Sequence, residues 1–297
     1  EMAMSKAQTL TLALRGTWRM RYGLASCPAH GDKHPSLTIA DAPSGRLLLS
    51  CKAGCSFLNV LGALRGLGLV EGSGSFTPPS PAEIAKREAE ERAEAEKAER
   101  RALATWREAL PITGTPAEAY LRGRGVTCKL PHTLRFHPEC WHPTAQRYPA
   151  MVGLIEGLPR AAIHRTYLRA DGTGKAGVEP AKAMQGAATG GAVRLMQADG
   201  PLVVAEGIET ALSLVSGLLP RPATIWAALS APGIASLRLP EIRPHRLTIA
   251  SDGDKAGQEA AHKLAERADA LGWTVSLLPA PQGRDWNDIL QMKGASA

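Results

Sequence analysis

The chain has 297 residues, of which 44% are hydrophobic and only 4% aromatic, and its formal net charge is +7. This length predicts two or three domains, and the composition predicts aliphatic cores and excludes a disordered protein. No apolar run approaches the roughly 18–20 residues of a membrane span, and no signal-peptide pattern is present, so we expect a cytoplasmic protein. The positive charge favours a polyanionic partner only weakly, because many proteins with this charge bind no nucleic acid.

The first predicted domain, residues 1–70, contains three cysteines and one histidine in two closely spaced pairs, CPAH at 27–30 and CKAGC at 51–55. Two such pairs can wrap one tetrahedral zinc ion, with β-like runs at 36–40 and 46–50 forming a hairpin between them. Three thiolates and one imidazole would fill the coordination sphere, so we expect a structural zinc. The alternative is a set of unrelated buried thiols. The candidate zinc ligands are Cys27, His30, Cys51 and Cys55.

Residues 71–110 are predicted to form a linker followed by a charged helix. EGSGSFTPPSP at 71–81 has the Gly, Ser and Pro content of a linker. From residue 82 the chain is dense in Ala, Glu, Lys and Arg, with i,i+4 pairs such as Glu83–Arg87 and Glu96–Arg100. We interpret this helix as a solvated spacer arm, and a partner-binding helix is the alternative.

A small α+β subdomain is predicted for residues 111–198, with short strands around 150–155 and 161–168. The sequence HPECWH within it offers three further metal ligands, His137, Cys140 and His142, but on a proline-interrupted loop, so we favour ordinary packing there. From residue 199 to 297 apolar strands alternate with amphipathic helices. This order predicts an α/β domain with a Rossmann-like parallel sheet covered on both faces.

Three acidic motifs follow predicted strands of this sheet. Glu206 follows PLVVA, Asp252 and Asp254 follow RLTIA, and GRDWND, with Asp285 and Asp288, comes after the last strand. Because the carboxyl ends of parallel strands meet at one edge, we expect these carboxylates to converge, and a crowded group needs a cation. Oxygen ligands favour Mg²⁺ or Mn²⁺, the ions of phosphoryl transfer. The alternative is that each acid only caps the helix that follows it.

These motifs carry a family resemblance. AEGIETALSL, ASDGDKAGQEAA and RDWNDIL resemble the TOPRIM domain of bacterial-type primases, topoisomerases and certain nucleases, and CPAHGDKHPSL with SCKAGC resembles the CHC2-like zinc-binding domain of primases. AIHRTYLRADGTGKA and GGAVRL resemble the segment that precedes TOPRIM in primase-like proteins of phages, plasmids and integrated elements. The chain as a whole therefore resembles a bacterial, phage or plasmid DNA primase.

The resemblance implies a role for each matching residue. Glu206 would act as general acid/base or assist metal binding, Asp252 and Asp254 would hold catalytic Mg²⁺ or Mn²⁺, and either Asp285 or Asp288 would add a ligand. The residues that would contact template or nucleotide phosphates are Arg165, Lys175 and Lys182. The alternative is that these three basic residues only form a solvated surface.

The function implied is synthesis of short RNA primers from NTPs on single-stranded DNA, in the replication of a phage, plasmid or integrated element. A separate replicative helicase is a further partner that this function suggests. A nuclease or nickase would use the same acids for hydrolysis, and a zinc-dependent DNA-binding accessory protein would not need them. A topoisomerase fits less well, because the chain has only four tyrosines and too little length for a strand-passage domain.

Overall fold

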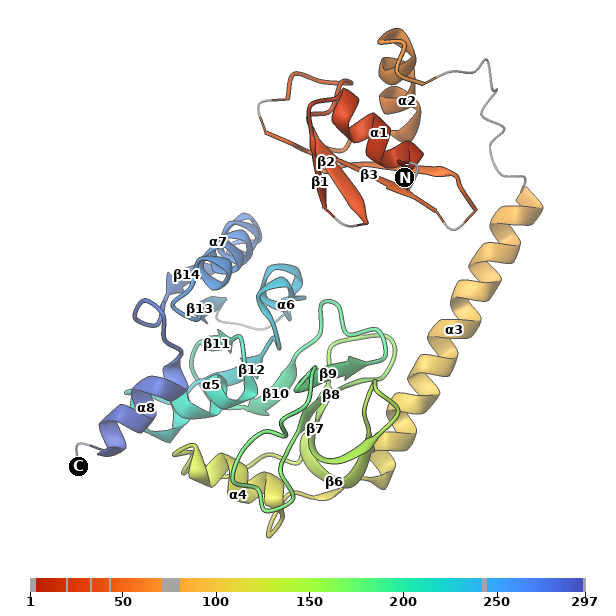
Figure 1. Ribbon diagram of the computed structural model, residues 1–297. Helices are drawn as coiled ribbons and strands as arrows, with labels where there is room; N and C mark the ends of the chain where they lie inside the picture. Colours follow the sequence, from red (N-terminus) through yellow and green to blue (C-terminus); the bar gives the residue numbers. More distant parts are fainter. Residues whose placement is uncertain are drawn as a thin grey trace. The chain divides into compact units, whose positions relative to one another are not determined.

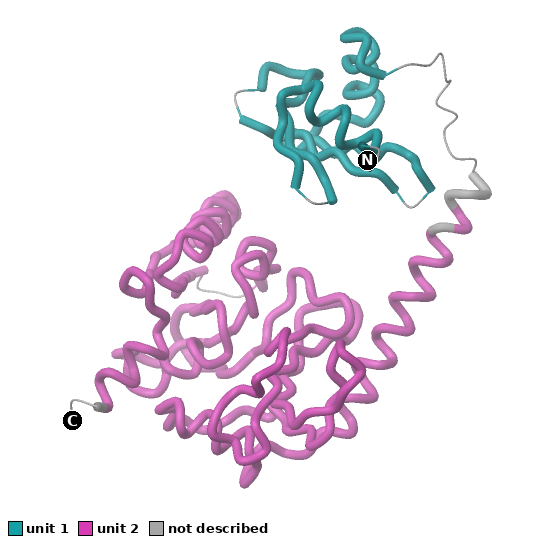
Figure 2. The backbone as a smooth tube through the Cα atoms, in the orientation of Figure 1, with its two compact units in different colours: residues 1–79 teal, residues 80–297 magenta. Residues whose placement is uncertain are grey.

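The computed structural model describes residues 4–19, 21–32, 34–42, 44–70, 81–241 and 245–295. It divides the chain into two compact units, residues 1–79 and 80–297 (Figures 1 and 2). Most of the predicted linker, residues 71–80, lies outside the described residues. Within the described ranges, no helix has both the length and the apolar character that crossing a bilayer requires.

The N-terminal unit is an antiparallel four-stranded meander with one helix before it and one after it. Its hairpin of β3 and β4 confirms the two β-like runs, and Leu37 of β3 is opposite Cys51 of β4. Ser5 and Ser56 cap the two helices through their hydroxyl oxygens. The elements are α1 (Lys6–Ala13), β1 (Thr17–Arg19), β2 (Tyr22–Ala25), β3 (Leu37–Asp41), β4 (Leu47–Cys51) and α2 (Phe57–Gly66).

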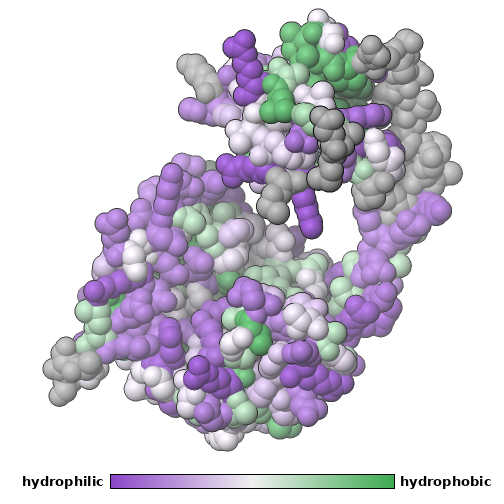
Figure 3. Space-filling view, in the orientation of Figure 1, coloured by the Kyte–Doolittle hydropathy of each residue, from purple (hydrophilic) through white to green (hydrophobic). Residues whose placement is uncertain are grey.

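The core of this unit is small, and apolar side chains remain on its surface. Leu37, Ile39, Val60 and Leu64 are fully buried between the sheet and the helices. Figure 3 shows hydrophobic surface over α2, where Leu58 is 54% exposed. A core of this size is marginal, so a metal that ties the turns together would contribute much of the unit's stability.

The charged helix is present as α3 (Pro81–Glu108), but only its first part is a solvated arm. Its second part packs against the following sheet, where Ala102 is buried beside Val152 and Ile163. Glu99 accepts hydrogen bonds from the Arg160 guanidinium at 3.0 Å and from the Ala161 backbone N–H at 2.8 Å. Figure 1 shows this end of α3 beside β8 and β9.

The subdomain after α3 is a five-stranded antiparallel sheet in the order β5-β6-β7-β8-β9, with one helix. One face of the sheet packs against α3, and the other face packs against the C-terminal sheet through side chains such as Leu134 and Met151. The elements are β5 (Leu110–Pro111), α4 (Pro116–Gly123), β6 (Leu134–Trp141), β7 (Arg147–Ile155), β8 (Ala162–Tyr167) and β9 (Lys182–Gln185).

The C-terminal sheet has the order β10-β12-β11-β13-β14, in which β12, β11, β13 and β14 are parallel. Its central strand, β11, is buried throughout because α6 and α7 cover one face and α5 with the preceding subdomain covers the other. The strands are β10 (Val193–Met196), β11 (Leu202–Ala205), β12 (Thr224–Ala227), β13 (Arg246–Ala250) and β14 (Thr274–Leu277). The helices are α5 (Ile208–Ser213), followed by an irregular turn at Leu214–Leu218 in which Gly217 has a φ of +120°, α6 (Ala231–Ser236), α7 (Lys255–Ala270) and α8 (Trp286–Ala295).

The edge strand β10 departs from the predicted all-parallel arrangement, since it pairs antiparallel to β12. β10 also lies before the domain boundary predicted at 198/199. The C-terminal sheet therefore includes one strand from the segment that was predicted to belong to the α+β subdomain. The strand has no helix between it and β11, and it therefore falls outside the strand–helix alternation that predicted the other four strands.

Candidate functional site

The two Cys/His pairs of the N-terminal unit come together. The ligand atoms of Cys27, His30, Cys51 and Cys55 all lie within 4.8 Å of one another, and the His30 Nδ1 is 3.3 Å from the Cys55 Sγ. Tetrahedral ligands about 2.0–2.3 Å from a zinc ion are about 3.3–3.8 Å apart, so this donor set fits zinc with little movement. Gly54, with φ of +87°, forms the tight turn between the last two cysteines.

Asp32, which sequence analysis did not single out, supports this site. Its carboxylate accepts the backbone N–H of Cys27 at 2.7 Å and the Ser36 hydroxyl at 2.6 Å, and it lies 3.6 Å from the His30 Nε2. These hydrogen bonds lower the pKa of Asp32 to about 2, so it is ionised at neutral pH. A carboxylate on the far nitrogen of a metal-binding histidine orients the ring and raises its basicity.

Among the three cysteines of the site, Cys51 has a lowered pKa. Burial opposes ionisation of Cys51, but hydrogen bonds from the Cys55 backbone N–H and the Ser36 hydroxyl outweigh it and lower the pKa of Cys51 to about 6. Burial raises the pKa of Cys27 to about 11 and also raises that of Cys55. A bound cation would be needed for all three sulfurs to be thiolates, which is the form that ligates zinc.

The acidic motifs of the C-terminal unit lie at the carboxyl ends of the strands, as predicted. Glu206 follows β11, and Asp252 and Asp254 follow β13. Burial, together with the charges of Glu206, Asp285 and Asp254, raises the pKa of Asp252 to about 7. Burial and the Asp254 charge likewise raise the pKa of Glu206.

Two loops carry these acids and are hydrogen-bonded to each other through their backbones. The Gly253 N–H donates to the Arg284 carbonyl at 2.8 Å, and the Gly283 N–H donates to the Gly253 carbonyl at 3.0 Å. A Cβ atom on Gly253 would lie 2.0 Å from the Pro281 carbonyl oxygen, so only glycine permits this approach. The glycine between the two aspartates therefore brings the Asp285 loop to their side.

The acids differ in how free they are to bind a cation. Asp252 Oδ1 is buried without a hydrogen-bond partner, whereas Asp254 caps α7 by accepting the Gly257 N–H at 2.7 Å. The mutual repulsion and the unpartnered oxygen fit a divalent cation such as Mg²⁺. Across the described ranges, however, only the Cys/His group has all its ligand atoms within 4.8 Å, so the carboxylates are more loosely gathered than a closed metal cage.

Asp285 and Asp288 have different surroundings. Each accepts the backbone N–H of the other, Asp288 N–H to Asp285 at 2.8 Å and the reverse at 3.1 Å, which caps the start of α8. Of the two, only Asp285 has a charge that raises the pKa of Asp252 and of Tyr120, and Asp288 is exposed to solvent. Of the two, Asp285 is thus placed with the other carboxylates.

A buried carboxylate that sequence analysis did not select, Glu209, holds two of the predicted basic residues. Its oxygens are 3.1 Å from the Lys182 Nζ and 3.7 Å from the Lys175 Nζ, and one accepts the Tyr120 hydroxyl at 2.8 Å. Burial opposes the charge of Glu209, but the two ammonium groups lower its pKa well below the ordinary range. The Lys182 charge also lowers the pKa values of Glu206 and Asp252, so Lys182 lies beside the acidic group.

Two further polar side chains border this network and have unpartnered atoms. His164 Nδ1 and Thr166 Oγ1 are buried without a hydrogen-bond partner. Burial and the Lys182 charge lower the pKa of His164 to about 4, so the ring is neutral at physiological pH. Buried polar groups are normally satisfied, and orphan groups beside charged side chains are typical of a binding site.

The third predicted basic residue, Arg165, lies on the other face of its sheet. Neighbouring strand residues point to opposite faces, and the Arg165 guanidinium donates to the carbonyls of Trp141 at 2.6 Å and Met184 at 3.3 Å. It is only 7% exposed. The structure therefore does not bring Arg165 together with Lys175 and Lys182, and its predicted phosphate contact stays a prediction.

The HPECWH segment does not gather into a second metal group among the described residues. His137 contacts Glu108 at 3.2 Å, and His142 contacts the Thr144 hydroxyl and the Pro180 carbonyl. Cys140 is buried in a separate apolar cluster with Tyr167. Packing and hydrogen bonds account for the contacts of these three residues.

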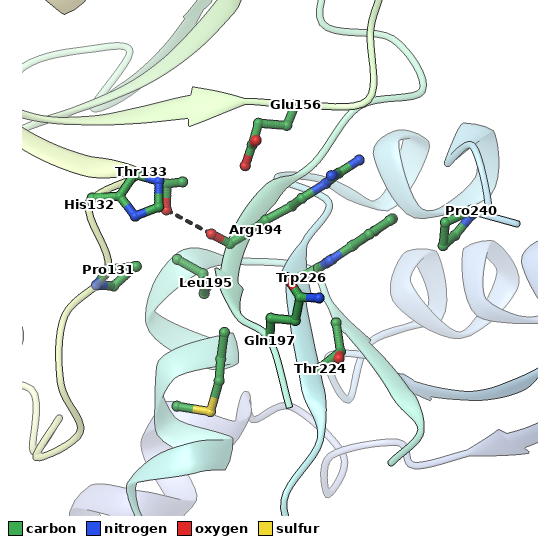
Figure 4. A pocket seen from close by; sticks show the side chains of 11 residues that line it. Pro131, His132, Thr133, Glu156, Arg194, Leu195, Gln197, Thr224, Trp226 and Pro240 are labelled. Atoms are coloured by element: carbon green, nitrogen blue, oxygen red, sulfur yellow. Dashed lines mark hydrogen bonds between the residues drawn. The ribbon is translucent and has the colours of Figure 1, made fainter. Parts of the chain in front are cut away.

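A cavity of about 390 Å³ lies at the other end of the C-terminal sheet (Figure 4). The guanidinium of Arg194 lies 4.8 Å from the Trp226 ring centroid, and Thr133 donates to the Arg194 carbonyl at 2.7 Å. Its lining includes Thr224, the first residue of β12, whereas Glu206 follows the opposite end of the neighbouring strand. None of the predicted acids lines this cavity.

Two family models match the second unit. Residues 96–195 match a domain of unknown function (DUF7146), and residues 201–296 match the Toprim domain. No curated protein matches the chain. A Toprim domain behind an N-terminal Cys₃His module supports the resemblance to primases.

Two solved structures are similar to the chain at a TM-score of 0.39. One is a DNA primase domain from Pseudomonas aeruginosa, 18% identical over 61% of this chain and 68% of that one. The other is the Aquifex aeolicus primase, with its zinc-binding and RNA polymerase domains, 14% identical over 99% of this chain and 84% of that one. Residues 201–296 are a Toprim domain.

Proposed function

We propose that this protein is a DNA primase that synthesises short RNA primers on single-stranded DNA by Mg²⁺-dependent nucleotidyl transfer. The proposal rests on the carboxylates that follow β11 and β13, with the loop of Asp285 hydrogen-bonded to the Gly253 loop and Asp252 Oδ1 buried without a partner. An acidic group that binds a divalent cation, next to fixed ammonium groups, suits a nucleoside triphosphate, which needs both.

Each part of the site has a task in this reaction. Asp252, Asp254 and Asp285 would hold Mg²⁺ or Mn²⁺, and Glu206, whose pKa is raised, is suited to accept the proton of the attacking primer 3′-hydroxyl. The divalent cation would supply charge neutralisation at the transferring phosphate. Lys175 and Lys182 would bind the triphosphate oxygens and orient the α-phosphate, so that the 3′-oxygen forms the new phosphodiester bond and pyrophosphate leaves. Zinc at the Cys₃His site would be structural.

The second candidate is a Toprim nuclease, since hydrolysis of a phosphodiester needs the same acids. The two lysines on Glu209 favour nucleotidyl transfer, because a triphosphate carries more charge than the single phosphate of a DNA backbone linkage. A non-catalytic accessory protein would give no reason for a buried, unpartnered carboxylate oxygen on Asp252 at a strand end.

Primer synthesis tests the proposal directly. The full chain is incubated with single-stranded DNA templates of varied sequence, NTPs and Mg²⁺, and labelled products are resolved by length. We expect short RNA from the wild type and none from Asp252→Ala. Cleavage of the template without NTPs would support the nuclease instead, and activity of Asp252→Ala equal to wild type would overturn both assignments.

A further inference from the structure

Trp141, at the end of β6, is an exposed aromatic residue in hydrophilic surroundings. It is 54% exposed, and in the described part of the second unit no other Phe, Trp or Tyr is more than about a third exposed. The chain around it, HPECWHPTAQR, is mainly polar, and most of its residues are exposed. A protein-binding surface would be expected to offer a larger continuous apolar patch than one ring.

The backbone at Trp141 is held firmly although its side chain is exposed. Its carbonyl accepts two hydrogen bonds, from Arg165 at 2.6 Å and from the Tyr167 hydroxyl at 2.8 Å. Arg165 also donates to Met184 of β9, which ties the end of β6 to that edge strand. Two buried donors thus fix the backbone that carries the exposed ring, which limits the ordering needed for a contact there.

One face of the ring is occupied by a cation. The Arg147 guanidinium lies 4.5 Å from the Trp141 ring centroid, and it is itself 3.8 Å from the Glu139 carboxylate. The pair borders a cavity of about 530 Å³ between α3 and the sheet, with Arg101, His137 and Gln185 in its lining. Its lining contains two arginines and two glutamates, so the cavity suits a planar polar group better than a row of phosphates.

We infer that Trp141, backed by Arg147, is a stacking platform for a base of a single-stranded nucleic acid. Stacking on tryptophan tolerates any sequence, because every base has a π face. The inference rests on the proposed function for its ligand, and it gives a role to residues within the segment that matches the domain of unknown function.

Strand β9 connects this platform to the acidic site. Gln185, at one end of the strand, lines the platform cavity, and Lys182, at the other end, binds Glu209. Four residues of strand span about 10 Å, which corresponds to about three nucleotides at about 3.4 Å each. β9 is the last strand of its sheet, so a template could cross this edge between the two sites.

Binding of a fluorescein-labelled oligo(dT) to the full chain, measured by anisotropy without NTPs, tests the platform. Loss of one stack, about 1–3 kcal/mol, predicts about 5- to 150-fold weaker binding for Trp141→Ala. Trp141→Phe retains most of the affinity, and the dependence on salt is unchanged because no phosphate contact is lost. Leu271→Ala, which removes a side chain 63% exposed on the same unit, is the matched control and binds like wild type.

Photocrosslinking of the wild type provides a readout that needs no variant. An oligonucleotide with 5-iododeoxyuridine is expected to crosslink to Trp141, identified by peptide mass spectrometry. The platform is overturned if Trp141→Ala binds the oligonucleotide as tightly as the wild type, or if the crosslink forms only at other residues. It is also overturned if Trp141→Ala loses self-association of the protein and keeps DNA binding. Primer synthesis separates the two claims, since an inactive wild type with a DNA-binding defect in Trp141→Ala overturns the primase proposal alone.

Discussion

Lys182 and Glu209 form an ion pair, with 3.1 Å between the ammonium nitrogen and a carboxylate oxygen, and Lys175 reaches the other oxygen at 3.7 Å. One buried carboxylate therefore holds two cations whose side chains are about a third exposed. The result is a fixed net positive charge beside the acidic group. Glu209 thus holds both lysine side chains in place before any nucleotide arrives.

Glu209→Gln is expected to weaken both the fold and the site. The two ammonium groups lose their counter-ion, and because they are partly solvated the loss should be about 1–3 kcal/mol, below the 3–5 kcal/mol typical of a fully buried pair. Primer synthesis should fall at least about tenfold because the lysines are no longer oriented. Thermal unfolding and the KM for NTPs measure the two effects.

Glu259→Gln is the matched control, because Glu259 pairs with Lys255 at 3.8 Å on the exposed side of α7, where the two side chains are 60% and 91% exposed. It should leave stability and activity unchanged. Equal behaviour of the two variants would show that the lysines do not depend on Glu209.

The carboxylates could be predicted from the sequence, whereas their neighbours could not. Glu206 and Asp252 follow apolar strands that are recognisable in the sequence, and parallel strands deliver such residues to one edge. Glu209 reads as an ordinary helix residue, and its bond to Tyr120 joins positions 89 apart. Which acid of GRDWND faces the site likewise depends on how the Gly253 loop packs. Local pattern thus locates the strand ends, but contacts between subdomains decide the network.

The pKa of Asp252 predicts a pH-dependent stability. Its folded value of about 7 is above the ordinary value of about 3.9, so the native protein binds a proton that the unfolded chain has already released between these pH values. Without added Mg²⁺, stability should fall as the pH rises from about 4 to about 7. Asp252→Asn should reduce this slope and melt above the wild type at pH 8, by about 2–4 °C per kcal/mol recovered.

Added Mg²⁺ should cancel the difference at pH 8, because the cation stabilises the ionised carboxylate of the wild type and not the amide. Asp199→Asn, at an exposed carboxylate outside the site, serves as the comparison and should follow the wild-type curve. A wild-type stability that is flat between pH 4 and 7 would contradict the crowding of the carboxylates.

Gly253→Ala is predicted to impair the site without altering a carboxylate. The new methyl group would meet the Pro281 carbonyl oxygen, so the two acidic loops must separate. We expect weaker Mn²⁺ binding by calorimetry and a large loss of primer synthesis. Gly294→Ala in α8, where an added Cβ meets nothing within 4 Å, should instead be neutral or stabilise by up to about 1 kcal/mol.

The Cys₃His site predicts one zinc per chain. Cys51→Ser should lose the metal and unfold the N-terminal unit, because its core is small and zinc binding would supply much of its folding free energy. Cys128→Ser, at a cysteine outside the group, should retain one zinc. Metal analysis with limited proteolysis measures both, and two zinc ions per chain in the wild type would contradict the packing interpretation of HPECWH.

Asp285 and Asp288 allow a test in which the two variants share one structural defect. Each carboxylate caps α8 through the other's N–H, so either change to Asn should cost about 1 kcal/mol or less, because Asn is also a good cap. Only Asp285 acts on Asp252, so only Asp285→Asn should weaken Mn²⁺ binding, reduce primer synthesis and lower the pKa of Asp252. Titration of the Asp252 carboxyl by NMR reports the last effect independently of catalysis. If Asp288→Asn were the more damaging variant in all three measurements, the metal ligand would be Asp288 and not Asp285.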